Sequence, residues 1–153
     1  MPVLGLKPSR RQLLGGLSAS LFPALLPNLA FASAADVARE IKKLVGEKVP
    51  VSGRIKLDIP QIAENGLIVP INVEVDSPMS NTDFVKAIHV FADGNPLPGV
   101  ATYRFTPASG KAAFSLRIRL AETQNVICLA ELSNGEVYAA KSEVKVTIGG
   151  CGG

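Results

Sequence analysis

Two cysteines and a single histidine are the side chains of this sequence best suited to nucleophilic or metal chemistry. Cys151 stands close to the C-terminus in the stretch IGGCGG, and its neighbours are Gly149, Gly150, Gly152 and Gly153. A cysteine thiolate is a strong nucleophile and a metal ligand. Because glycine has no side chain, this pattern predicts a sulfur with no protein side chains packed against it.

The five residues 149–153 are interpreted as a flexible arm. Glycine adopts backbone conformations that other residues avoid, so such a segment can enter a narrow passage. From Ile148 to Cys151 the extended reach is about 10 Å, enough to place the sulfur in the pocket of another protein. A frayed terminus is the alternative interpretation. Frayed tails are usually polar, however, and this one has no polar side chain.

The electrostatic surroundings make Cys151 a weak nucleophile by itself. An exposed thiol has a pKa of about 8.5. The last five residues contain no basic side chain, and the terminal carboxylate lies two residues away. An enzyme that activates this sulfur therefore has to supply its own cation, metal or heme, and the arm is its substrate.

The other two candidates are interpreted as structural. Cys128 lies in the apolar stretch NVICLAEL, where a thiol packs as a small hydrophobe. A disulfide between Cys128 and Cys151 would draw the arm onto a strand interior, so an intermolecular disulfide is the better oxidised alternative. His89 lies in FVKAIHVFAD without a ligand set at metal spacing, which favours a structural or surface role. We expect no catalytic residue, no metal site and no cofactor.

Charge separates the chain into two parts. The formal net charge is +3, but the first 35 residues contain Lys7, Arg10 and Arg11 and no acidic residue, so the remaining 13 basic and 13 acidic residues balance. The excess positive charge therefore lies in the first 35 residues, and we expect no nucleic-acid partner.

Residues 1–34 are interpreted as a signal peptide of the twin-arginine type. Arg10 and Arg11 precede an apolar run that glycine and proline interrupt, and small residues follow around Ala32 and Ala34. A membrane helix is the alternative, but the interruptions argue against stable insertion. The expected location is the periplasm, with a mature chain that starts between Ser33 and Asp36.

Residues 35–148 predict an all-β domain with a short N-terminal helix. The stretch DVAREIKKLVG has Asp36 as the expected N-cap, a stop at Gly46, and apolar residues at helical spacing, namely Val37, Ile41, Leu44 and Val45. Later segments alternate instead, as in Ile71, Val73 and Val75; Phe114, Leu116, Ile118 and Leu120; and Val144, Val146 and Ile148.

Turn signals separate these alternating segments. They occur at residues 64–66, 93–96, 108–110 and 133–135, each with a glycine. About seven short strands spaced by such turns predict an immunoglobulin-like antiparallel β-sandwich. One domain of this size forms its own core.

Several stretches closely resemble the SoxY family, the sulfur-carrier subunits of the periplasmic thiosulfate-oxidising Sox system. They are VEVDSPMS, VKAIHVFADGNPLP, FTPASGKA, RIRLAETQNV and the ending EVKVTIGGCGG. The resemblance implies that Cys151 is the covalent attachment point for sulfur intermediates, held as a thiosulfonate or a persulfide, and that the chain is not itself an enzyme. It also implies a heterodimer with SoxZ. Transient partners would be the heme protein SoxAX, which joins thiosulfate to the cysteine, SoxB, which hydrolyses the sulfone, and SoxCD where present.

Two other classes of function fit parts of the sequence. An adhesion or assembly module could use the terminal cysteine only to link two copies through a disulfide. A ubiquitin-related sulfur donor would use the carboxylate of Gly153 as a thiocarboxylate. That chemistry needs ATP, which an exported protein would not find.

Overall fold

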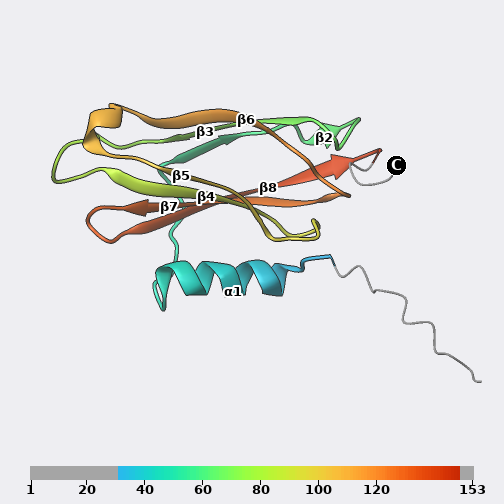
Figure 1. The fold of residues 1–153 in the computed structure, drawn as a ribbon, viewed down its shortest axis with the longest axis horizontal. Helices are drawn as coiled ribbons and strands as arrows, with labels where there is room; N and C mark the ends of the chain where they lie inside the picture. Colours follow the sequence, from blue (N-terminus) through green and yellow to red (C-terminus); the bar gives the residue numbers. More distant parts are fainter. Residues whose placement is uncertain (1–30, 149–153) are drawn as a thin grey trace, which may run out of the picture.

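A short helix and eight strands make up the described part of the chain. The computed structural model describes residues 31–148. Figure 1 shows two β-sheets stacked face to face, with the helix lying across the outer face of one of them. The elements are α1 (Ala34–Val45), β1 (Ile55–Asp58), β2 (Ile62–Ala63), β3 (Val69–Val75), β4 (Val85–Ala92), β5 (Gly99–Arg104), η2 (Pro107–Ser109), β6 (Ala112–Ile118), β7 (Gln124–Leu132) and β8 (Val137–Val146).

The strands form a two-sheet sandwich. The smaller sheet has the order β1-β3-β6 and the larger one the order β2-β8-β7-β4-β5. Strand pairs are antiparallel except for β2 and β8, which are parallel over two residues. The predicted mostly-β sandwich with one short helix is therefore confirmed. The described residues contain one strand more than expected, and the four predicted turns all lie between strands.

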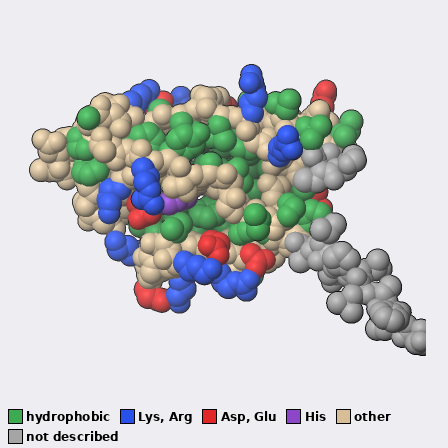
Figure 2. All heavy atoms as spheres, viewed as in Figure 1, with side chains coloured by type: hydrophobic (Ala, Val, Ile, Leu, Met, Phe, Trp, Pro, Cys, Tyr) green, Lys and Arg blue, Asp and Glu red, His purple; other side chains and the backbone are tan. Residues whose placement is uncertain are grey.

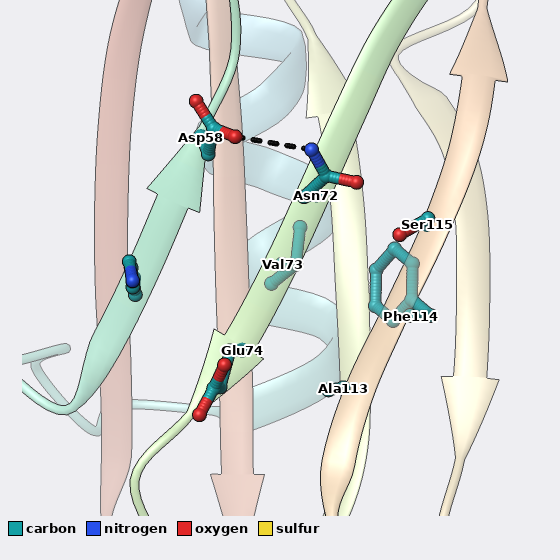
Figure 3. A pocket seen from close by; sticks show the side chains of 8 residues that line it. Asp58, Asn72, Val73, Glu74, Ala113, Phe114 and Ser115 are labelled. Carbon is teal, nitrogen blue, oxygen red and sulfur yellow. Dashed lines mark hydrogen bonds between the residues drawn. The ribbon is translucent and has the colours of Figure 1, made fainter.

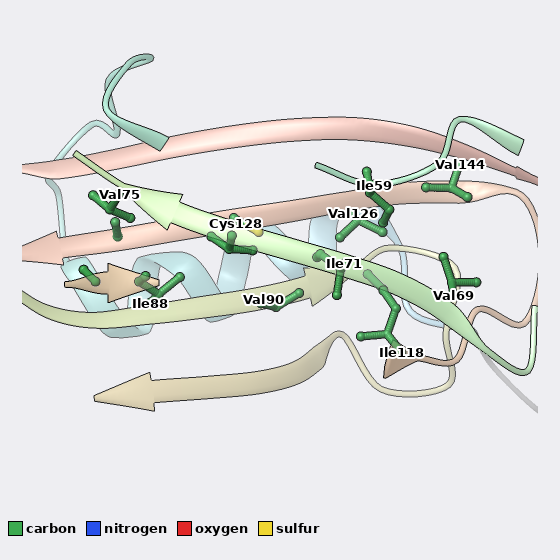
Figure 4. Close-up of a cluster of buried hydrophobic side chains, with 14 of the residues drawn as sticks. Ile59, Val69, Ile71, Val75, Ile88, Val90, Ile118, Val126, Cys128 and Val144 are labelled. Carbon is green, nitrogen blue, oxygen red and sulfur yellow. The ribbon is translucent and has the colours of Figure 1, made fainter. Parts of the chain in front are cut away.

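The core lies between the two sheets, and alternation along each strand generates it. In β3 every second residue is buried, from Val69 through Ile71 and Val73 to Val75, while the residues between them face outward. Cys128 of β7 lies in the same cluster (Figure 4). Burial of this apolar surface is the main favourable contribution to folding.

Helix α1 covers the outer face of the larger sheet. Its buried residues Val37 and Val45 pack with Phe91 of β4, Leu129 of β7 and Val137 of β8. Strands β4 and β7 are therefore covered on both faces, which explains why six consecutive residues of β4 are buried.

One local prediction about the helix, its N-cap, is wrong. The N-cap is Ser33, because the Asp36 amide donates to Ser33 Oγ (3.3 Å) and the Ser33 amide donates to Asp36 Oδ2 (2.7 Å). Asp36 is thus the third helical residue of a capping box. Leu44 is 44% exposed and does not belong to the buried face, whereas the stop at Gly46 is confirmed by its φ of 67°.

Candidate functional site

The predicted site itself lies outside the described residues. Cys151 and its glycines Gly149, Gly150, Gly152 and Gly153 follow the last described residue, Ile148, and the signal residues Arg10 and Arg11 precede the first. The structure therefore shows the residues from which the predicted arm would leave the sandwich. We call these residues, Thr147 and Ile148, the arm root.

The arm root and the end of β8 are hydrogen-bonded to β2 and to the turn that follows it. The amide of Lys145 donates to the Gln61 carbonyl (2.8 Å), and the amide of Thr147 donates to the Ala63 carbonyl (3.1 Å). The carbonyl of Ile148 accepts from the Gly66 amide (2.8 Å). Strand β2 and the turn that follows it thus hold the chain in place from the end of β8 to Ile148, the last described residue.

Side chains add to this anchoring. The Thr147 hydroxyl donates to the Glu64 carbonyl (2.9 Å), and the hydroxyl of Thr123 accepts from the Val146 amide (2.9 Å). Ile148 itself is 66% exposed, so the alternation predicted through this residue ends at Val146.

Cys128 is a packing residue, as predicted. It lies in the middle of β7, opposite Val90 of β4 and Ala140 of β8, and its free thiol is fully buried. Burial raises the pKa of Cys128 to about 12, because the apolar surroundings disfavour the charged thiolate. This sulfur is therefore neutral and shielded at neutral pH. A disulfide to Cys151 would require the core to open.

His89 is structural, but its partners were not visible in the sequence. The ring is 4% exposed, its Nε2 lies 2.8 Å from Glu131 Oε1, and its Nδ1 lies 3.0 Å from Thr102 Oγ1. A neutral imidazole with its proton on Nε2 satisfies both bonds, donating to the carboxylate and accepting from the hydroxyl. Both ring nitrogens are thus engaged, which leaves neither lone pair for a metal.

Several open hollows lie on the surface of the described residues. One of about 430 Å³ lies on the outer face of the smaller sheet, where Asp58 accepts from the Asn72 amide group (3.0 Å; Figure 3). Glu74, on the same face, pairs with Lys111 at 3.0 Å. These carboxylates face solvent and already have partners, so they form no acid–base pair.

Neither a metal centre nor a membrane span emerges from the part of the chain that the structure describes. Residues 31–148 contain no cluster of three or more His, Cys, Asp or Glu side chains arranged to hold an ion. Within the same range, no helix has both the length and the apolar character needed to cross a bilayer.

The fold defines a two-sheet β-sandwich protein with one short N-terminal helix. Comparison with known proteins specifies the class further: the model of the family described as "Sulfur oxidation protein SoxY" matches residues 41–151. The sulfur carrier protein SoxY from Chlorobium limicola f. thiosulfatophilum is 35% identical, with a TM-score of 0.62 over 76% of this chain and 100% of that one. The chain belongs to the SoxY family of sulfur oxidation proteins.

More distant structures share the fold alone. The superoxide reductase (neelaredoxin) from Ignicoccus hospitalis is 16% identical with a TM-score of 0.51, covering 62% of this chain and 81% of that one. A putative superoxide reductase from Thermotoga maritima is 19% identical with the same TM-score, covering 60% and 84%. No curated protein matches the chain. The sandwich is thus a scaffold that proteins of different names share, and function has to be argued from the site.

Proposed function

We propose that this chain carries sulfur intermediates of thiosulfate oxidation, bound covalently to Cys151, and presents them to partner enzymes. The observation that supports this assignment is the state of the other thiol. Cys128 is fully buried with a pKa raised to about 12, so a sulfur that enzymes are to reach has to be that of Cys151. Membership of the SoxY family supports the same chemistry.

The loading step is an oxidation that a partner has to drive. The Cys151 thiol and thiosulfate form a new S–S bond to give a protein thiosulfonate, with release of one proton and two electrons. SoxAX, as the heme partner, accepts these electrons. Nothing in the C-terminal sequence lowers the pKa of Cys151, so activation of the thiol also belongs to the partner.

The release step needs water but no oxidant. SoxB hydrolyses the S–S bond to the terminal sulfone group, so that sulfate leaves with the water oxygen and a persulfide stays on Cys151. SoxCD, where present, oxidises this remaining sulfur. In this scheme the chain is a substrate of each enzyme in turn and is not itself catalytic.

The proposal includes the partner subunit and the route of export. SoxZ pairs with this sandwich as a heterodimer. The twin-arginine signal, residues 1–34, directs the protein to the periplasm and is removed there. The match to the SoxY family of sulfur oxidation proteins supports both statements.

Intact mass spectrometry tests the carrier chemistry. After incubation with thiosulfate and SoxAX, the native protein is expected to gain the mass of a thiosulfonate on its C-terminal peptide, and SoxB is expected to reduce this to one added sulfur atom. Cys151→Ser removes both adducts and Cys128→Ala keeps them. A protein that only forms a disulfide-linked dimer through Cys151, without either adduct, would contradict the proposal and support the assembly-module alternative.

A further inference from the structure

The bonds at which the signal peptide is expected to be cut lie inside folded structure. The mature chain is expected to start between Ser33 and Asp36, so the candidate cuts fall between Ala32 and Asp36. Ala32 is 7% exposed, and its amide donates to the Asn95 carbonyl (2.7 Å). The Ser33 carbonyl accepts from the amides of Asp36 (2.9 Å) and Val37 (3.1 Å), and the capping box closes the same turn. Every candidate cut therefore lies within hydrogen-bonded backbone.

This backbone stays wound because α1 is docked on the larger sheet. The helix has 12 residues, and an isolated helix of that length is only marginally stable in water. Its apolar face packs through Val37 and Val45 against Phe91, Leu129 and Val137. Figure 2 shows charged side chains gathered over α1, along the bottom of the view, so the remainder of the helix faces water. Loss of the apolar contacts would therefore release the first turn as well.

We propose that the docking of α1 on the sheet gates removal of the signal peptide. Proteases cut exposed, mobile backbone in preference to hydrogen-bonded helix, so the peptidase acts on the molecules in which α1 has left the sheet and its first turn has unwound. The reaction is hydrolysis of one peptide bond, with water as the co-reactant. This inference rests on the proposed twin-arginine signal, because that route implies a chain that folds before export.

The gate makes the rate of processing a measure of helix docking. Opening of a single docked helix is a local event that leaves the sandwich folded. When opening and closing are fast relative to cleavage, the rate of cleavage is proportional to the fraction of open molecules. A substitution that weakens the contacts of α1 with the sheet should therefore speed up cleavage by the same factor by which it raises that fraction.

Matched substitutions in the purified full-length precursor test the gate. Val45→Ala weakens docking from the helix, nine residues beyond the last candidate cut, and Leu129→Ala weakens it from the sheet. Val73→Ala is the control, because it removes the same two methyl groups as Val45→Ala, but from the core between the sheets. Each precursor is incubated with purified signal peptidase in detergent micelles, and mass spectrometry follows loss of the signal peptide. Circular dichroism checks that the sandwich stays folded, and hydrogen exchange of the Val37 amide measures opening of the helix.

Both docking variants are expected to be cut about tenfold faster or more, because the buried groups they lose contribute that much to docking. Exchange of the Val37 amide should accelerate by the same factor, and Val73→Ala should match the unmodified precursor in both measurements. Equal cleavage rates for all four proteins would overturn the gate. So would equal acceleration by Val73→Ala, which would indicate cleavage through global unfolding, or an unprotected Val37 amide in the unmodified precursor.

The outcomes separate this inference from the proposals on which it rests. If the periplasmic protein keeps Arg10 and Arg11, the export proposal is wrong and the gate falls with it. If the signal peptide is removed as expected but the docking variants are cut no faster than the control, only the gate is wrong. The carrier chemistry of Cys151 is measured on the mature protein and stands in either case.

Discussion

The buried thiol of Cys128 gives a stability prediction whose sign depends on pH. Cys128→Ala removes a sulfur that contacts both sheets of the core, and we expect a loss of about 1–2 kcal/mol in the free energy of unfolding near neutral pH. At alkaline pH the thiol instead lowers the free energy of unfolding. Its pKa is raised to about 12 in the folded state, whereas it is about 8.5 in the unfolded chain.

The sign follows from proton linkage. A group with a raised folded-state pKa contributes stability that is complete below the unfolded-state pKa and is lost as the pH rises toward the folded-state value. At about pH 10 the unfolded chain gains about 2 kcal/mol by ionising Cys128, since each pKa unit corresponds to about 1.4 kcal/mol. Cys128→Ala has no thiol at this position to ionise, so its unfolded chain does not gain this free energy. The two proteins should therefore reach similar stability near pH 10, and the variant should be the more stable one above it.

Urea unfolding followed by circular dichroism at neutral and alkaline pH measures this crossover. Both proteins carry Cys151→Ser, so that the second thiol neither titrates nor forms disulfides, and their other titratable groups are identical. A stability difference that stays constant between neutral pH and about pH 10 would show that Cys128 is not held as a buried neutral thiol, and the reasoning would fail.

Further predictions concern the processing site, a packed glycine, the arm and the partner. N-terminal sequencing of the periplasmic protein should give a first residue between Ser33 and Asp36, because small residues precede each of these candidate cuts; a start upstream of Ser18 would contradict the export signal. Gly94→Ala should destabilise the fold by about 1–3 kcal/mol in thermal unfolding, because its Cβ would lie 2.9 Å from Gln124 Cβ, whereas Gly99→Ala meets nothing within 4 Å and should be neutral. Replacing Gly150 and Gly152 together by valine should lower turnover with SoxAX and SoxB while iodoacetamide still labels Cys151, and normal turnover would show that the glycines do not serve enzyme access. Size exclusion of the co-expressed pair should give a heterodimer with SoxZ; full activity of the isolated monomer would argue against an obligate partner.

Local patterns in the sequence predicted the strands, the turns and the role of Cys128. The alternation of β3 is encoded residue by residue, because successive side chains point to opposite faces of a sheet. The packing of Cys128 followed from its apolar neighbours in the chain, and the structure confirms it.

Those local patterns could not predict contacts between residues that are far apart in the sequence. Glu131 is 42 residues from His89, and only the pairing of β4 with β7 brings the two side chains together. The short strand β2 lies parallel to the end of β8, and its two residues carry too little periodicity to be recognised. Ser33 and Asp36 both suit a helix start, and only their reciprocal bonds show which one is the cap.

The strand β2 connects the fold to the proposed function, because it sets where the arm begins. Without the bonds to Ala63, Glu64 and Gly66, the last anchored residue would be Val146, and the five residues to Cys151 would reach about 17 Å. With those bonds, the last anchored residue among those described is Ile148, and the extended reach from it to Cys151 is about 10 Å. A shorter tether confines the sulfur to a smaller volume, which raises its effective concentration at a docked active site. In the proposed function the anchored root and the glycine arm would therefore be complementary: the root would fix the position from which the sulfur is presented, and the arm would let each enzyme accept it.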